Sequence, residues 1–188
     1  MKPRDMTQIA LFAAIMGAMG LMPPITLGIT PVPITLQSMG VMLAGGILGA
    51  KKGALSLLVF LLITAAGLPL LSGGVGGLGV FVGPTAGFLC GYAIVPFFIG
   101  YAIERMKTVA YWKIIAVNVL FGIMLLYVFG MFGQALVMNI SPLTALKTNL
   151  IFLPGDLLKV MLASYLVCRI RKSPAIIRQL GLQPSKNA

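Results

Sequence analysis

The chain alternates long apolar runs with short segments that carry charges, glycines or prolines. Each run is close to the length of about 20 residues that an α-helix needs to cross a bilayer. None shows the strict alternation of apolar and polar residues that is typical of a membrane β-strand. The pattern therefore predicts an all-α membrane protein, one domain over residues 1–188, with six transmembrane helices at about 6–22, 36–50, 53–71, 85–103, 113–138 and 149–168.

The composition strengthens this prediction. Hydrophobic residues make up 59% of the 188 residues and charged residues only 9%, whereas a soluble domain is about 25% charged. The surface of a small soluble domain cannot accommodate so much apolar side chain. We therefore expect a multi-pass protein of a lipid bilayer, with no separate soluble catalytic domain.

The formal net charge of +11 could suggest a nucleic-acid partner. The positions of the cations relative to the predicted spans indicate a membrane orientation instead. If the N-terminus is cytoplasmic, six spans return the C-terminus to the same side. Lys147 then lies outside and Lys159 within a helix, which fits the positive-inside rule. We expect cytoplasmic termini, a basic cytoplasmic tail at 169–188, long outer connections after the first and third helices, and no nucleic-acid partner. The other cations are expected on the cytoplasmic side: Lys2, Arg4, Lys51, Lys52, Arg105, Lys107, Lys113, Arg169, Arg171, Lys172, Arg178 and Lys186.

The chemical inventory argues against an enzyme. The chain has no His, and its only acids are Asp5, Glu104 and Asp156. Acid–base catalysis needs a pair of such groups in one site, and the two cysteines, Cys90 and Cys168, are too far apart in sequence to suggest a metal site. We expect no catalytic residue, no metal and no cofactor.

Asp156 and Lys159 are the only charges placed well inside a predicted span. Charges at this depth are costly unless they are paired or face a polar cavity. Three residues apart on a helix, the two side chains lie on the same face. Pro154-Gly155 directly precedes Asp156, and a proline there removes a donor of helical hydrogen bonds. We interpret Asp156 and Lys159 as the floor of a binding site, against the alternatives of a salt bridge that only locks helix packing and an ordinary helix kink.

Other candidate binding residues lie in the outer connections and in the spans. The connections 23–37 and 72–84 are too apolar for free loops, so we expect them to fold over the mouth of the bundle rather than remain flexible. Gly74 and Gly79 would let the backbone approach a ligand closely; the GxGxxG match that they delimit lacks the strand and the acid of a dinucleotide site. Four polar residues in or near spans are interhelical hydrogen bonds or ligand contacts: Tyr92, Asn118, Gln134 and Asn149.

Small residues recur every fourth position in the first helix, at Ala10, Ala14 and Ala18. Such a stripe lets another helix pack closely in lipid. From the residues alone, internal packing and docking of a partner protein are equally good explanations.

Residues 31–92, which run from PVPITLQSMGVMLAGG to VFVGPTAGFLCGY, resemble the BioY family, the biotin-specific substrate-binding components of energy-coupling factor (ECF) transporters. PGDLLKV in the sixth helix resembles the same family's late motif. The resemblance implies a six-helix bundle in the cell membrane of a prokaryote that binds biotin from outside. It also implies docking through the alanine stripe to a transmembrane coupling subunit, which works with two ABC ATPases, so that only the partners use ATP.

The chemistry of biotin agrees with this resemblance. Its ureido group offers two N–H donors and one carbonyl acceptor, which Asp156 and Lys159 complement. Tyr92 and the apolar loop residues would cover the rings, and loop N–H groups, Thr35 or Gln37 would take the carboxylate. The alternative function is a stand-alone secondary transporter of a small solute that uses Asp156 as a proton site.

Overall fold

The computed structural model describes residues 2–26, 28 and 32–181; Lys186 and the end of the predicted tail lie outside these residues. The described part of the chain is helical, and its only extended pairings are two isolated bridges, Ile25 with Ile34 and Leu71 with Val75. The helices are α1 (Pro3–Gly20), α2 (Gln37–Leu43), η1 (Ala44–Leu48), α3 (Ala50–Ala65), η2 (Leu78–Phe81), α4 (Ala86–Glu104), α5 (Tyr111–Val117), η3 (Asn118–Leu125), α6 (Leu126–Met138), α7 (Pro142–Asn149), η4 (Leu150–Phe152), α8 (Leu153–Lys172) and α9 (Pro174–Leu180).

In three places, consecutive elements join into one longer helix. The π-helical segment η1 continues α2, the π-helical segment η3 joins α5 to α6, and the 3₁₀ turn η4 joins α7 to α8. Among the described residues, three helices are long and apolar enough to cross a membrane. They are α4 by itself, Ala86–Glu104, and two of the joined helices, Tyr111–Met138 and Pro142–Lys172. Gln37–Leu48 is a shorter apolar helix.

Two boundaries differ from the sequence prediction. The third helix ends at Ala65 rather than near residue 71, because Gly67 adopts a φ of 110° and Pro69 follows it. The last helix starts earlier than residue 149, because the Ser141 hydroxyl accepts a hydrogen bond from the Thr144 N–H and caps α7. The described part of the predicted basic tail is largely helical, since α8 continues to Lys172 and α9 follows.

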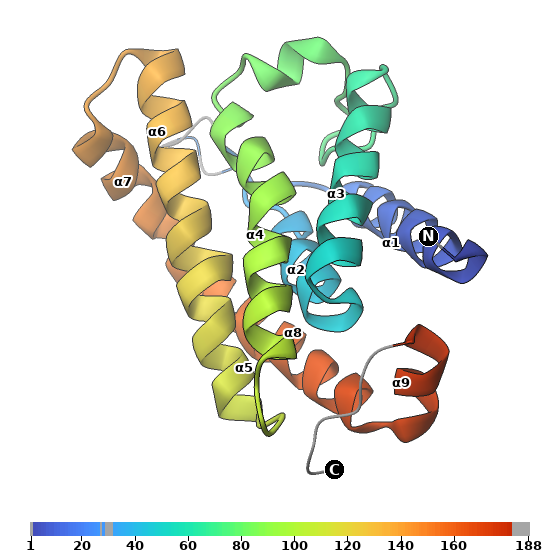
Figure 1. The fold of residues 1–188 in the computed structure, drawn as a ribbon. Coiled ribbons are helices and arrows are strands. Elements are labelled where there is room, and N and C mark those ends of the chain that lie inside the picture. The colour runs from blue at the N-terminus through green and yellow to red at the C-terminus, as the bar shows by residue number, and fades with distance from the viewer. Residues whose placement is uncertain (1, 27, 29–31, 182–188) are drawn as a thin grey trace.

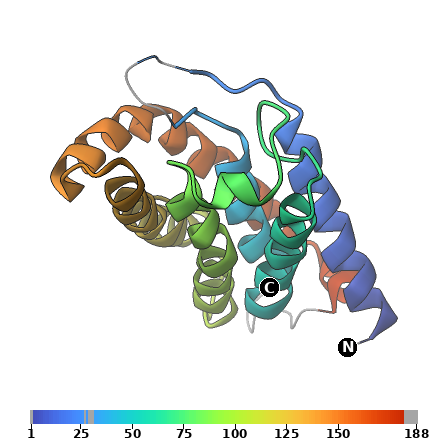
Figure 2. The same ribbon diagram turned by 90° about the horizontal axis from the view of Figure 1, so that it is seen from above.

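The helices pack into a bundle in which α4 is central. Figures 1 and 2 show α3 and α6 on two sides of α4, with α1 alongside α3. Close approach depends on glycine, since a Cβ at Gly87 would collide with the α6 backbone at Phe129 and a Cβ at Gly100 with the start of α3. Buried apolar side chains fill the interior, the largest fully buried ones being Met16, Met42, Leu48, Leu57, Phe60, Ile99, Ile103 and Ile114.

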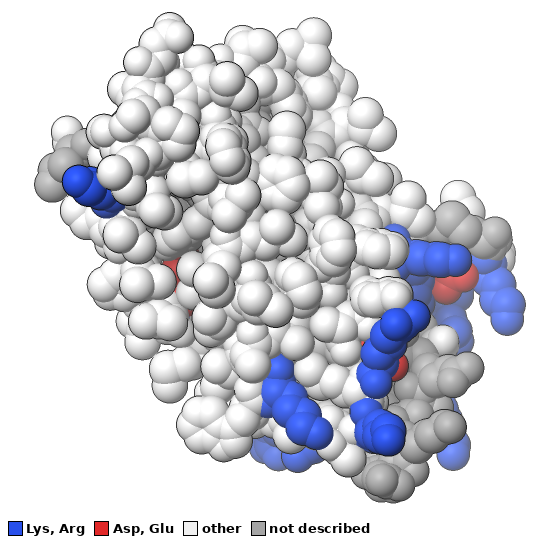
Figure 3. Space-filling view, turned by 60° about the vertical axis from the view of Figure 1, so that its left-hand side comes forward, with Lys and Arg blue, Asp and Glu red and all other residues white. Residues whose placement is uncertain are grey.

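The outer surface is divided between apolar and basic regions. Large apolar side chains stay exposed along the helices, for example Leu62, Leu136 and Leu158, as expected for surfaces that contact lipid. On the face drawn in Figure 3, most Lys and Arg side chains gather toward one end, and the remaining surface is almost free of charge. On this face the cations are therefore concentrated at one end, a pattern that the positive-inside rule associates with one side of a membrane.

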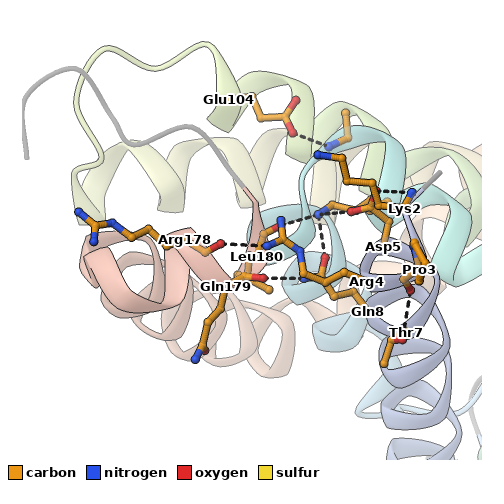
Figure 4. A network of polar contacts seen from close by, with 12 residues as sticks. Lys2, Pro3, Arg4, Asp5, Thr7, Gln8, Glu104, Arg178, Gln179 and Leu180 are labelled. Carbon is orange, nitrogen blue, oxygen red and sulfur yellow. Dashed lines mark hydrogen bonds and ion pairs between the residues drawn. The ribbon is translucent and has the colours of Figure 1, made fainter.

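A polar network ties both ends of the chain together at the basic end (Figure 4). The Lys52 ammonium donates to Gln8 Oε1 and to the Leu180 carbonyl, both at 2.7 Å, and pairs with Asp5 at 3.5 Å. Arg4 donates to the Arg178 carbonyl at 3.2 Å. These donors satisfy carbonyls at the C-terminal end of α9, so α9 is held against the start of α1.

Candidate functional site

A cavity of about 360 Å³ opens between the helices and the two connections that precede α2 and α4. This volume is at the lower end of the range typical of small-molecule sites. Most of its wall is apolar, and its polar groups are few. The lining residues are Val32, Pro33, Ile34, Thr35, Gln37, Ser38, Leu71, Ser72, Val75, Val80, Gly83, Pro84, Thr85, Phe88, Leu89, Tyr92, Leu126, Tyr127, Phe152, Asp156 and Lys159.

Asp156 and Lys159 both line this cavity from the first turns of α8. As their spacing predicts, they form an ion pair, with Lys159 Nζ 2.8 Å from Asp156 Oδ1. Their side chains are 9% and 12% exposed. Asp156 and Lys159 thus form the polar corner of a cavity that is otherwise largely apolar.

The Lys159 ammonium uses all three of its donors within the protein. Besides Asp156, it donates to the Thr35 carbonyl at 2.6 Å and to Ser38 Oγ at 3.0 Å. It therefore ties α8 to the segment that enters α2. Any further acceptor has to take the place of one of these three partners.

Two residues of this corner were not predicted from the sequence. Tyr127, on α6, donates to Asp156 Oδ2 at 2.7 Å, and Ser38, on α2, lies 3.4 Å from Asp156 Oδ1. A tyrosine in the middle of an apolar span was the one signal that pointed to Tyr127. No sequence signal pointed to Ser38, because its contact with Asp156 depends only on the packing of α2 against α8.

Gln37, predicted as a contact of the ligand carboxylate, lies at the cavity and is hydrogen-bonded within the protein. Its side chain lines the cavity and is 2% exposed, but its amide is already bonded. Nε2 donates to the carbonyls of Met16 and Leu70, at 3.2 and 3.0 Å, and Oε1 accepts from the Ser72 N–H at 3.3 Å. Gln37 thus joins α1, α2 and the connection before α4.

Thr35 and Tyr92 lie at the cavity wall. The Tyr92 ring is buried on α4, and Thr35 contributes the carbonyl that binds Lys159. Ser72 lines the cavity too, and its buried hydroxyl has no hydrogen-bond partner among the described residues.

The remaining predicted binding residues lie elsewhere. Asn118 is fully buried between helices, where its amide donates to Ser164 Oγ at 2.9 Å, which matches the interhelical alternative. Gly74 and Gly79 are exposed and are not among the described residues that line the cavity. In that connection Val75, Val80 and Gly83 reach the cavity instead.

The alanine stripe faces away from the bundle. Ala10, Ala14 and Ala18 are exposed, whereas Ala13 and Gly17, which lie beside the stripe toward the core-facing side of α1, are buried. Of the two explanations for the stripe, internal packing against the chain's own described helices is therefore wrong. The stripe is available to a partner helix or to lipid.

Comparison with known proteins identifies the family of the chain. The BioY family model matches residues 1–175. The chain is 46% identical to the probable biotin transporter BioY of Bacillus subtilis (strain 168) over 169 residues, covering 90% of this chain and 91% of that protein. It is 45% identical to the biotin transporter BioY of Rhizobium etli over 175 residues, covering 88% and 92%.

A solved structure has the same fold. It is the crystal structure of the S-component for biotin from an ECF-type ABC transporter, which superposes with a TM-score of 0.87 at 36% identity and covers 92% of this chain and 95% of that one. The family match over almost the whole length, the two close relatives and the shared fold lead to one conclusion: this chain belongs to the BioY family.

Proposed function

We propose that this protein is the biotin-binding membrane subunit of an ECF-type importer. The observation that carries the proposal is the apolar cavity with one polar corner, in which Asp156 and Lys159 form an ion pair. The names of the similar proteins, biotin transporter and S-component for biotin, support the choice of ligand. The subunit binds biotin and is not itself an enzyme.

The ureido group of biotin fits the polar corner. Its N–H donors match the Asp156 carboxylate and its carbonyl matches the Lys159 ammonium. Because the three donors of Lys159 are already bonded, the ligand carbonyl replaces the Thr35 carbonyl or the Ser38 hydroxyl. Binding of biotin is therefore coupled to the segment that enters α2.

The rest of the ligand lies along the apolar wall. Tyr92 and Phe88 offer aromatic surface to the rings and the valeryl chain. The Ser72 hydroxyl, buried and without a described partner, is a donor for the carboxylate at the far end. Gln37 is less suited to this role than the sequence suggests, because its amide would have to give up a bond to α1 or to the connection before α4.

The orientation that we propose has six spans and cytoplasmic termini, with the cavity open to the outside. The basic end that holds α9 and the start of α1 (Figures 3 and 4) would then face the cytoplasm, in agreement with the positive-inside rule. The connections that line the cavity would face outside.

A labelling experiment tests this orientation. With both native cysteines replaced by alanine, a cysteine at Ile34 or Val75, which line the cavity, should react with an impermeant thiol reagent added outside cells, and biotin should protect it. A cysteine at the exposed Lys107 is the matched control and should react only after permeabilisation. The reverse pattern would overturn the topology.

The proposed partners are a transmembrane coupling subunit and two ABC ATPases in a prokaryotic cell membrane, and ATP is used by those partners alone. Uptake into liposomes distinguishes this proposal from a secondary transporter. The purified subunit alone should move no biotin with or without a proton gradient, whereas the subunit with its partner module should accumulate biotin when ATP is inside. Proton-driven uptake by the subunit alone would favour the alternative and assign Asp156 to proton transfer.

A further inference from the structure

The hydroxyl of Tyr127 has the shortest hydrogen bond to the carboxylate of the polar corner. It lies 2.7 Å from Asp156 Oδ2, and the tyrosine is only 6% exposed although it lines the cavity. Tyr127 is the second residue after η3. A π-helical segment turns more slowly than an α-helix and so changes which residues face inward after it. Here it is followed by Leu126 and Tyr127, which both line the cavity.

A count of hydrogen bonds shows where Asp156 can accept a ligand. An ionised carboxylate offers about four acceptor positions, two on each oxygen. Oδ1 has Lys159 at 2.8 Å and Ser38 at 3.4 Å. Among the described residues, Oδ2 has Tyr127 alone. One acceptor position therefore remains, on Oδ2 and beside the tyrosine hydroxyl.

We propose that Tyr127 is a positioning residue that fixes Asp156 so that Oδ2 accepts one N–H of a cyclic urea, and that it thereby sets the preference of the cavity for such ligands. The proposal rests on the biotin-binding function proposed above. The carboxylate of an aspartate rotates easily about its last bond. With Oδ1 held by Lys159 and Oδ2 held by Tyr127, its plane is fixed from both sides. Without the phenol, Oδ2 is free to leave the direction in which the ligand's N–H arrives.

The test compares biotin with two analogues in which one or the other ureido nitrogen carries a methyl group. In the wild-type protein one of the two N-methyl analogues should bind much more weakly than biotin. Tyr127→Phe should bind biotin about tenfold more weakly, as expected for a lost hydrogen bond to a charged group. The ratio between that analogue's Kd and biotin's Kd should become smaller in the variant, whereas a general loosening of the cavity would weaken all ligands alike and leave the ratio unchanged.

A double-mutant cycle separates action through Asp156 from direct contact with the ligand. If Tyr127 acts through Asp156, Tyr127→Phe should cost little further affinity in an Asp156→Asn background, so that the two effects are not additive. Tyr111→Phe is the matched control, because the Tyr111 hydroxyl also donates to α8, at 3.4 Å from the Met161 carbonyl, but lies outside the cavity lining. It should leave biotin affinity unchanged.

Each outcome bears on one proposal. Biotin affinity of Tyr127→Phe within about twofold of wild type, or full additivity in the cycle, would overturn the role of Tyr127. If Tyr127→Phe fails to fold, the measurement on the wild-type protein remains a test. Equal affinity of the wild-type protein for biotin and for both N-methyl analogues would also overturn the proposed role of Tyr127. Failure of the wild-type protein to bind any biotin would instead overturn the proposed function.

Discussion

Replacing Lys159 with methionine, or Asp156 with asparagine, should reduce the affinity for biotin at least about tenfold, since each loses a charge-assisted hydrogen bond of roughly 1.5–3 kcal/mol. Lys159→Met also removes the group that bonds the Thr35 carbonyl and Ser38, and it leaves a buried carboxylate without its counter-ion. Titration calorimetry of the purified variants measures both effects.

The double variant Asp156→Asn with Lys159→Met is the control for folding. It removes both charges together, so no unpaired charge stays buried and the variant should be at least as stable as either single variant. It should nevertheless bind biotin weakly. Unchanged biotin affinity in both single variants would show that the ion pair only locks α8 in place.

Ala14→Trp should abolish most ATP-dependent uptake of biotin and leave biotin affinity near that of the wild type. Ala14 lies in the middle of the exposed stripe on α1, outside the cavity lining. A bulky side chain there holds a partner helix away and removes dispersion contacts along several turns. The variant should also fail to co-purify with the coupling subunit.

Leu136→Trp is the matched control. Leu136 is 79% exposed on α6, on the other side of α4 from α1 and α3 (Figure 2). A tryptophan there should affect neither uptake nor binding. Intact uptake by Ala14→Trp would place the docking surface elsewhere, and loss of biotin binding would mean that α1 supports the cavity directly.

Local features of the site could be predicted from the sequence, because helical periodicity decides them. Asp156 and Lys159 are three residues apart in an apolar run, and that spacing alone brings them together. The apolar connection 72–84 is likewise expected over the mouth of the bundle, and its residues Val75 and Val80 line the cavity. Which of its glycines approach the cavity was not predictable, since Gly83 does and Gly74 and Gly79 do not.

Contacts between distant segments could not be predicted. Ser38 is 118 residues from Asp156 in sequence, and Tyr127 is 29 residues from it on another helix. The orientation of Tyr127 also depends on η3, and the apolar run 113–138 carries no sequence signal that distinguishes a π-helical segment from an α-helix. The bonding of Gln37 depends on three segments meeting, so its polarity indicated a contact but not the partner.

The most direct test of the account is a titration of the purified wild-type protein with biotin. The cavity predicts saturable binding of one biotin per chain, and biotin should compete fully with a labelled biotin analogue for that single site. Binding should occur without ATP and without partner subunits, because the cavity-lining residues all come from this chain. Absence of saturable binding by the folded subunit alone, or binding that persists unchanged in Asp156→Asn with Lys159→Met, would contradict the account.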